Sequence, residues 1–371
     1  DFQLYQNTSV TYLPEGAILL RNLIDRAAKA ERFIFLEYFI LAEGKLWDEL
    51  EKILCAKARE GVEVKIIFDD FGNIKRFSGE TIDRLREVGV EVFIFNPVHE
   101  YVNRLHFNYR DHRKIACIDG DVAYTGGVNI ADEYANIIER FGYWKDSGVC
   151  LEGEGAWGLT ASFIRMCVNL GGVMHNEHDY YRPHTPVKSE GFCQPFTDGP
   201  QNNPDNPAED VFLQMISGAR RFLYITTPYF IPDESLMRAL CIAGDGGVDV
   251  RMLPGKPDHW YADCVAESYF GELIKHGVKV YRYTPGFLHG KSIMVDREAA
   301  FVGSANMDYR SFELDYECGV MVYSVPMIES LLEDMDMIVD RSHLVTAEEW
   351  AKRSVLRRVF EPLLRLFAIW M

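Results

Sequence analysis

The sequence lacks several features that would place it in a familiar class at once. No run of about 18 or more apolar residues occurs in its 371 residues, so no segment is expected to cross a bilayer as a helix. The cysteines form no C-x-x-C pair and no Cys/His spacing typical of a zinc site. We therefore expect a globular or peripheral protein with reduced, mostly buried thiols. Disulfides are the less favoured alternative, kept open by the even number of cysteines.

Basic residues are also scarce. The chain has 39 Lys and Arg against 56 Asp and Glu, a formal net charge of −17. Proteins that bind nucleic acid broadly usually present a basic face to the phosphates, so no nucleic-acid partner is expected. A local cationic cleft remains compatible with this balance. With 48% hydrophobic residues, the chain is long enough for two domains with complete cores.

One pattern, however, occurs twice at identical internal spacing. The two copies are His112-x-Lys114-x4-Asp119-x6-Gly126-Gly127-x-Asn129 and His289-x-Lys291-x4-Asp296-x6-Gly303-Ser304-x-Asn306. A single His-x-Lys-x4-Asp string arises easily by chance, but two copies with the same glycine and asparagine tail do not. The alternative, in which both histidines are ordinary residues of a duplicated fold, is much the weaker. We therefore predict one active site built from two halves.

The duplication extends to the segments that precede each motif. The matching pairs are residues 30–40 with 219–231, 61–68 with 247–253, and 89–95 with 277–283. In the last two pairs a glycine precedes β-branched alternation, which is typical of a helix end that opens a strand. The predicted fold class is therefore α/β, with two pseudo-symmetric lobes. Each lobe is expected to be a β-sheet flanked by helices, with one active site at their interface.

Two irregular stretches interrupt this symmetry. Prolines and asparagines cluster between Arg182 and Asp210, so we predict an N-terminal lobe of residues 1–186 and a C-terminal lobe of residues 187–371. Gly89 and Gly277 are 188 positions apart but the motif histidines only 177, so the first half carries 11 extra residues. We place these within 98–111, which includes Arg104, His106, Tyr109 and Arg110. This insertion is either a wall of the substrate pocket or a surface loop.

The residue types in the motif suit a phosphodiester substrate. The side chains of a His-x-Lys pair on a strand point to the same face, so two such strands would bring two imidazoles and two ammonium groups into one cleft. Lysine and asparagine donate hydrogen bonds to phosphate oxygens, and glycine lets the backbone approach closely. One histidine can attack phosphorus while the other transfers protons. Lysines and a histidinium would stabilise the developing charge, so no metal or other cofactor is expected.

With these residues identified, the chain resembles the phospholipase D superfamily and, within it, the family of bacterial cardiolipin synthases. The resemblance covers nearly the whole chain. It rests on residues 108–114 (NYRDHRK) with 118–120 (IDG), 142–146 (GYWKD), 227–232 (TPYFIP) and 303–313 (GSANMDYRSFE).

The resemblance implies a role for each matching residue. The six catalytic positions would be His112, Lys114, Asp119, His289, Lys291 and Asp296, with His112 as nucleophile and His289 as acid and base. From their spacing alone, Asp119 and Asp296 are expected to brace the fold rather than touch substrate. The phosphate-lining positions would be Asn129, Ser304 and Asn306. Glu317 and Asp146 would each orient a histidine through its second ring nitrogen, although a solvent-exposed turn is the alternative for Asp146.

The resemblance also implies a reaction and a location. The reaction would transfer a phosphatidyl group from one phosphatidylglycerol to the free glycerol hydroxyl of another, through a phosphohistidine. Hydrolysis to phosphatidic acid, or transfer to another alcohol, is the alternative, and a nuclease or a non-enzymatic lipid-binding protein is less favoured. The expected partners are phosphatidylglycerol and an anionic membrane surface, and the sequence sets no oligomeric state. We expect a bacterial membrane location, peripheral or anchored by helices upstream of this chain.

The end of the chain is the candidate membrane contact. Residues 353–371 combine four arginines with large apolar residues, the composition of an interfacial helix. The alternative is that this segment packs on the second lobe as a terminal helix.

Overall fold

The computed structural model describes residues 2–98, 108–176, 179–202, 205–256, 260–354, 357 and 364–365. The elements of the first half are β1 (Thr8–Leu13), α1 (Gly16–Ala27), β2 (Phe33–Tyr38), α2 (Lys45–Arg59), β3 (Glu63–Asp69), α3 (Asp70–Asn73), α4 (Gly79–Glu87), β4 (Glu91–Phe95), β5 (Arg110–Asp111), β6 (Lys114–Ile118), β7 (Val122–Gly126), β8 (Tyr143–Lys145), β9 (Gly148–Gly153) and α5 (Ala156–Asn169).

The second half begins with β10 and repeats much of this order. Its elements are β10 (Phe192–Asp198), α6 (Pro207–Gly218), β11 (Phe222–Thr227), β12 (Phe230–Ile231), α7 (Glu234–Asp245), β13 (Asp249–Pro254), α8 (Trp260–Lys275), β14 (Lys279–Tyr283), β15 (Gly286–Leu288), β16 (Ser292–Val295), β17 (Ala299–Gly303), β18 (Met307–Asp308), α9 (Tyr309–Glu313), β19 (Asp315–Tyr323), α10 (Met327–Asp340), β20 (Ser342–Leu344) and α11 (Ala347–Ala351).

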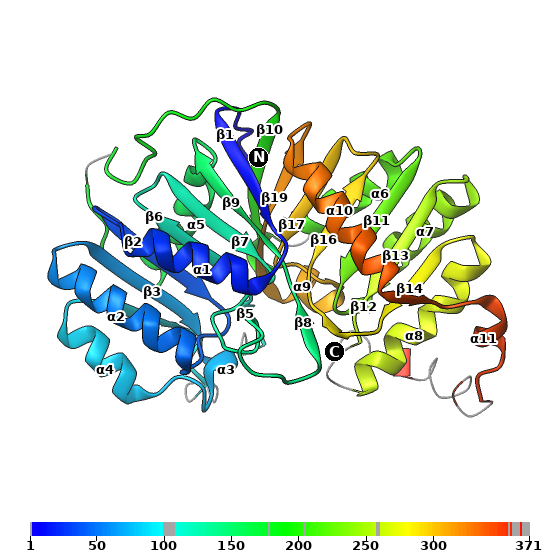
Figure 1. Cartoon of the computed structure of the whole chain (residues 1–371), viewed down its shortest axis with the longest axis horizontal. Helices are drawn as coiled ribbons and strands as arrows, with labels where there is room; N and C mark the ends of the chain where they lie inside the picture. The colour runs from blue at the N-terminus through cyan, green and yellow to red at the C-terminus, as the bar shows by residue number, and fades with distance from the viewer. Residues whose placement is uncertain are drawn as a thin grey trace.

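Each half contributes one large mixed sheet, and the two sheets have equivalent strand orders (Figure 1). The first sheet runs β1-β9-β7-β6-β2-β3-β4, and the second runs β10-β19-β17-β16-β11-β13-β14-β20, with β5 added to β19. In both, three parallel strands adjoin an antiparallel group. The predicted class, α/β with two pseudo-symmetric phospholipase D-type lobes, is therefore confirmed.

Glycines end the helices that lead into the second and third parallel strands of each sheet, as the repeat predicted. Gly61 and Gly89 follow α2 and α4 with φ of 92° and 93°, and Gly247 and Gly277 follow α7 and α8 with φ of 84° and 80°. Left-handed backbone of this kind is disfavoured for any residue with a side chain. The glycines thus set where each strand starts, and hence which residues reach its far end.

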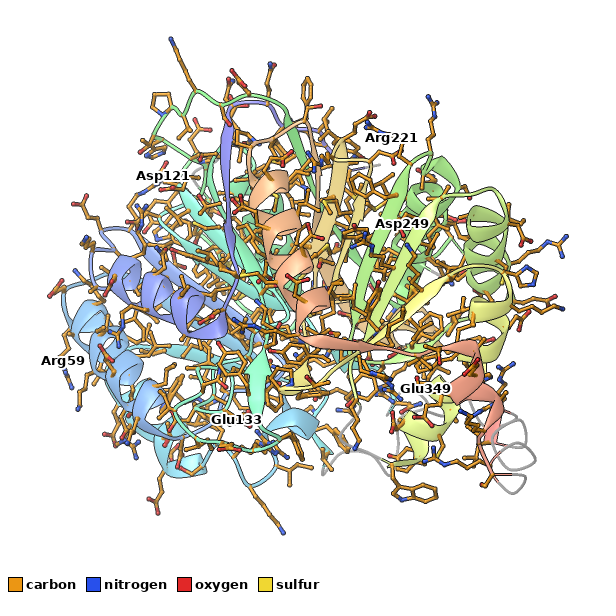
Figure 2. The ribbon with its side chains drawn as sticks, turned by 45° about the vertical axis from the view of Figure 1, so that its right-hand side comes forward. Arg59, Asp121, Glu133, Arg221, Asp249 and Glu349 are labelled. Atoms are coloured by element: carbon orange, nitrogen blue, oxygen red, sulfur yellow. The ribbon has the colours of Figure 1, made fainter. Side chains whose placement is uncertain are left out.

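The lobes share a central core. Helices α1, α2 and α4 cover the outer face of the first sheet, and α6, α7 and α8 cover the outer face of the second. The inner faces of both sheets pack together with α5 and α10 in one apolar cluster, in which Phe35 stacks on Phe163 at 4.5 Å between centroids. Charged side chains project outward from the periphery, as at Arg59 and Arg221 (Figure 2).

Three expectations concern segments between or beyond these sheets. The lobe boundary at residue 186 stays a prediction. An isolated β-bridge pairs Tyr5, near the start of the chain, with Cys193, shortly after this boundary. Most of the predicted insertion, residues 99–107 with Arg104 and His106, lies outside the described residues, and its end forms β5. In the described part of the chain, no helix has the length and apolar character needed to cross a bilayer.

Candidate active site

Short strands that cross between the lobes bring the two motifs together. β5 pairs in parallel with β19 of the other lobe, and β8 pairs in parallel with β15. His112 follows β5, and its backbone N–H donates to the Tyr316 carbonyl at 2.9 Å. His289 follows β15, and its N–H donates to the Lys145 carbonyl at 2.7 Å. Each histidine is therefore held by backbone of the opposite lobe.

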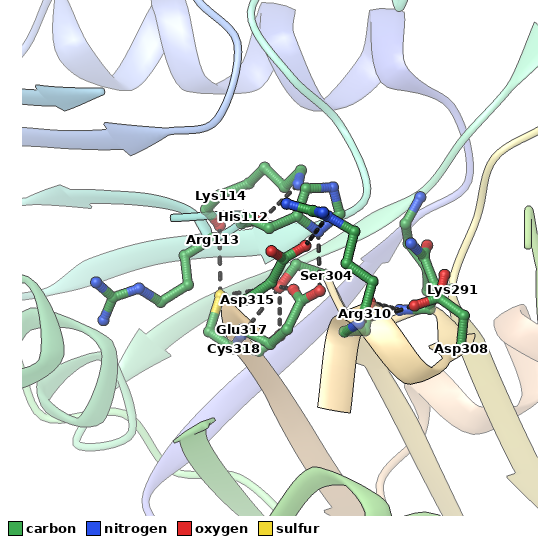
Figure 3. Close-up of polar contacts among 12 residues, drawn as sticks. His112, Arg113, Lys114, Lys291, Ser304, Asp308, Arg310, Asp315, Glu317 and Cys318 are labelled. Atoms are coloured by element: carbon green, nitrogen blue, oxygen red, sulfur yellow. Dashed lines mark hydrogen bonds and ion pairs between the residues drawn. The ribbon is translucent and has the colours of Figure 1, made fainter. Parts of the chain in front are cut away.

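Each imidazole is also oriented by a carboxylate from the opposite lobe. Nδ1 of His112 lies 2.9 Å from Oε1 of Glu317, and Nδ1 of His289 lies 2.6 Å from Oδ2 of Asp146 (Figure 3 shows the former pair). Both carboxylates are buried, at 1% exposure each, so the alternative of an exposed turn for Asp146 is wrong. With Nδ1 engaged, Nε2 is the ring nitrogen left for a substrate.

Two buried lysines complete the centre. Lys114 and Lys291 are each 1% exposed, and Nζ of Lys291 lies 2.9 and 3.2 Å from the two ring nitrogens of His289. Burial lowers the pKa of Lys114 to about 8 and that of Lys291 to about 7. Both ammonium groups are thus close to losing their protons, and an anion between them would restore their charge.

The same environment keeps the histidines neutral. Burial, followed by the charges of Lys114 and Lys291, holds the pKa of His112 well below its ordinary value. Burial and Lys291 lower the pKa of His289 to about 4, despite the opposing effect of Asp146. At pH 7 in the free enzyme, both rings therefore carry a free lone pair, the form required of a nucleophile or a base.

The motif aspartates lie at the far ends of the motif strands, away from the histidines. Asp119 accepts the backbone N–H groups of Glu31, Arg32 and Phe33 at 2.7–2.9 Å, just before and at the start of β2. Asp296 does the same for residues 220–222 at the start of β11, at 2.8–2.9 Å. Both carboxylates thus have the bracing position that their spacing suggested.

The three predicted phosphate-lining residues differ in their contacts. Asn129 accepts from the Ile40 N–H at 3.0 Å and donates to the Tyr134 hydroxyl at 2.8 Å, so its amide has partners in the protein. Ser304 donates its hydroxyl to Glu317. Among the described residues, only Asn306 of the three keeps a buried oxygen, Oδ1, without a hydrogen bond.

Sequence reasoning gave Arg310 no role. Its guanidinium extends beside the His112 imidazole (Figure 3), and its charge contributes to the low pKa of that ring. Nε lies 3.3 Å from the Asp315 carboxylate, and the two terminal nitrogens donate to Asn108 at 3.2 and 3.3 Å. A lone arginine in a short helix has no spacing signature, so only the fold shows that it belongs to the site.

The cluster has one arrangement that could hold a metal. His112, Asp315 and Glu317 place potential ligand atoms within 4.8 Å of one another. The cationic groups of Lys114, Lys291 and Arg310 act on this same region, as the pKa of His112 records. Their charge repels a divalent cation and attracts an anion, so the site is better matched to a phosphate.

Comparison with known proteins agrees with this geometry. Residues 20–137 and 212–339 match the family described as cardiolipin synthase, phospholipase D-like domain. The chain is 36% identical to a cardiolipin synthase of Halalkalibacterium halodurans, over 98% of this chain and 72% of that protein. It is also 36% identical to the major cardiolipin synthase ClsA of Bacillus subtilis, over 98% and 75%.

The chain belongs to the cardiolipin synthase family of the phospholipase D superfamily. A solved structure, phosphatidylserine synthase from Haemophilus influenzae, has the same fold, with a TM-score of 0.73, 16% identity, and coverage of 99% of this chain and 93% of that one. The protein is therefore an enzyme of this superfamily, and its two motif copies fall within the two matched segments.

Proposed function

We propose that this enzyme makes cardiolipin from two molecules of phosphatidylglycerol, with release of glycerol. The observation that carries the proposal is the pair of histidines, near enough for one charge to act on the other, each with Nδ1 bound to a buried carboxylate of the other lobe. Such a pair supplies one nucleophile and one proton carrier at a single phosphorus. The names of the relatives supply the product, cardiolipin.

In the first step, Nε2 of His112 attacks phosphorus and forms a P–N bond. The bond from phosphorus to the headgroup glycerol breaks, and the departing oxygen takes a proton from Nε2 of His289. Glu317 stabilises the positive charge that develops on the His112 ring. Ser304 holds that carboxylate in place, which preserves the ring orientation during attack.

In the second step, His289 takes the proton from the free glycerol hydroxyl of a second phosphatidylglycerol. The resulting oxygen attacks phosphorus, the P–N bond breaks, and the electron pair returns to His112. Water in the place of this hydroxyl would give phosphatidic acid instead. His289 thus acts first as acid and then as base at the same apical position.

His289 must be protonated to serve as the acid, although its pKa in the free enzyme is about 4. The negative charge of a bound phosphodiester opposes the effect of the two lysines and raises this pKa. Lys114, Lys291 and Arg310 would then contact the non-bridging oxygens, where charge builds up. Because both substrates are lipids, we place the working enzyme at an anionic bacterial membrane, as a peripheral domain or anchored by segments outside this chain.

Product analysis tests this function directly. The 371-residue chain is incubated with phosphatidylglycerol vesicles, and lipids are measured by mass spectrometry. We expect cardiolipin and glycerol in equal amounts, and none from His112→Ala. Since one phosphodiester replaces another, excess glycerol should convert cardiolipin back to phosphatidylglycerol. Phosphatidic acid as the main product, or no effect of glycerol, would contradict the proposal.

A further inference from the structure

Large exposed apolar side chains gather in three segments beside the active site. The first lies at and after α3, the second precedes β8, and the third is the start of α8. Their exposed fractions range from 37% to 67%. The members, which we call the rim, are Phe71, Ile74, Ile137, Ile138, Phe141, Trp260 and Tyr261.

The three segments share one edge of the molecule. α3 follows β3, and α8 comes after β13, the strand equivalent to β3 in the second sheet. Figure 1 shows α3, the loop before β8 and the first turn of α8 along the lower edge. Arg76 and Arg140 both bind Oε1 of Glu133, at 2.8 and 3.1 Å, which ties the first two segments together. Glu133 lies at this edge in Figure 2.

An aromatic path joins the rim to a catalytic histidine. The Phe141 ring, 40% exposed, lies 6.2 Å from Trp144 and 6.0 Å from Phe287, between centroids. Those two rings lie 5.3 and 5.4 Å from His289. A single layer of aromatic side chains thus separates an exposed rim residue from the reacting centre, so the rim borders the active site.

The charge of the rim differs from that of the whole protein. The described residues of these segments include two exposed cations, Lys75 and Arg140, and one exposed carboxylate, Glu139; Lys256, four residues before α8, is a further exposed cation. The chain as a whole has a net charge of −17. Cations interspersed with Trp, Tyr, Phe and Ile are the composition that binds the headgroup region of anionic bilayers.

We propose that the rim enters the interfacial layer of an anionic phospholipid bilayer and so holds the active site against its lipid substrates. The inference rests on the proposed function, because that function requires lipid substrates. Most of residues 353–371, the membrane contact expected from composition, lies outside the described residues. In the described part of that segment, Arg365 donates to Ser268 at 2.6 Å and lies over the Tyr269 ring at 3.9 Å, so it packs on α8.

Matched triple variants test the rim. The rim variant is Phe71→Ser/Ile137→Ser/Trp260→Ser, with one change per segment at 56%, 41% and 67% exposure. The control is Val173→Ser/Ile242→Ser/Met337→Ser, at 79%, 60% and 50% exposure but away from the rim. We expect the rim variant to lose roughly tenfold or more in co-sedimentation with phosphatidylglycerol vesicles, because apolar burial drives interfacial binding. The control should stay within about twofold of wild type.

A monomeric substrate separates binding from folding and chemistry. Dihexanoyl phosphatidylglycerol below its micellar concentration should be turned over equally by all three proteins. Equal sedimentation of the rim variant and wild type, an equal loss in the control, or failure of wild type to sediment would overturn the proposal. So would a rim variant that changes only from dimer to monomer, since the rim would then bind a second copy.

Product analysis on the same vesicles distinguishes this inference from the function beneath it. If vesicle binding depends on the rim but no cardiolipin forms, the proposed reaction is rejected and the rim remains a membrane-binding surface. Cardiolipin synthesis with rim-independent binding would reject the rim alone.

Discussion

The two halves of the active site are alike in sequence but differ in how each carboxylate is held. In the second motif, the Ser304 hydroxyl donates to Glu317, the partner of His112. Gly127 stands at the equivalent position of the first motif, and a Cβ there would lie 2.2 Å from Oδ1 of Asp146. Asp146 therefore occupies the space that a side chain would need, and it accepts the Ser147 N–H at 2.8 Å instead.

The two carboxylates also differ in protonation, so the histidines have unequal surroundings. Burial raises the pKa of Glu317 to about 7. For Asp146, the effect of burial is outweighed by His289 and Lys291, and its pKa falls below the ordinary value. Because Asp146 is fully ionised, it stabilises the protonated form of the His289 ring, which suits a group that gains and loses a proton. The Ser304 hydroxyl by itself lowers the pKa of Glu317, so burial sets the protonation of this carboxylate while the serine holds it in place.

The largest predicted effect is loss of either histidine. His112→Ala and His289→Ala should each lower kcat on phosphatidylglycerol by at least about 10²–10⁴-fold, because general acid–base help alone has this magnitude. A lipid with a nitrophenol leaving group needs no proton donor. On that substrate, release of nitrophenol should recover in His289→Ala and stay absent in His112→Ala. Equal recovery of both would mean that the halves are interchangeable.

Substitution at the glycine and serine positions tests the comparison next. Gly127→Ala should displace Asp146 and lower kcat by about 10²-fold, the effect expected of a misplacement near 1 Å. Ser304→Ala removes one hydrogen bond to a carboxylate and should cost on the order of tenfold. Steady-state kinetics with circular dichroism as a folding control measures both. A larger loss in Ser304→Ala than in Gly127→Ala would refute the packing argument.

The pH dependence of kcat/KM should reveal the titration of the two active-site lysines. Because the pKa of Lys291 is about 7 and that of Lys114 about 8 in the free enzyme, both lose charge as pH rises. An anionic substrate prefers the charged forms, so kcat/KM should fall on the alkaline side, by at most about tenfold per pH unit for each lysine. Lys291→Arg stays protonated and should move this fall to higher pH. An unchanged alkaline limb in this variant would exclude Lys291 as its source.

The smallest effect on catalysis is expected at the motif aspartates. Asp119→Ala and Asp296→Ala each remove the acceptor of three strand-opening N–H groups. Each should lower the free energy of unfolding in urea by about 1–3 kcal/mol. The two losses should be similar, since the braces are equivalent, and kcat of the folded fraction should change little. A loss of kcat with full stability would instead place these carboxylates in the chemistry.

The parts of the fold and site that depend on local sequence pattern could be predicted from the sequence. The two motif copies, the positive-φ glycines and the alternation of helix and strand predicted two α/β lobes and one composite site. The partner of each histidine depends on which short strands pair across the lobes, as β8 does with β15. No spacing encodes that crossing. Sequence spacing also does not show that Asn129 accepts a hydrogen bond from Ile40, or that α9 brings Arg310 to His112.

The most direct test of the central claim is the location of the covalent intermediate. His289→Ala is mixed with the nitrophenyl lipid, quenched in alkali to preserve the P–N bond, and digested for peptide mass spectrometry. The division of roles predicts one phosphatidyl adduct, on His112, and none in His112→Ala. An adduct on His289 in the wild-type enzyme would contradict this division of roles. So would the absence of an adduct on His112 in both the wild-type enzyme and His289→Ala.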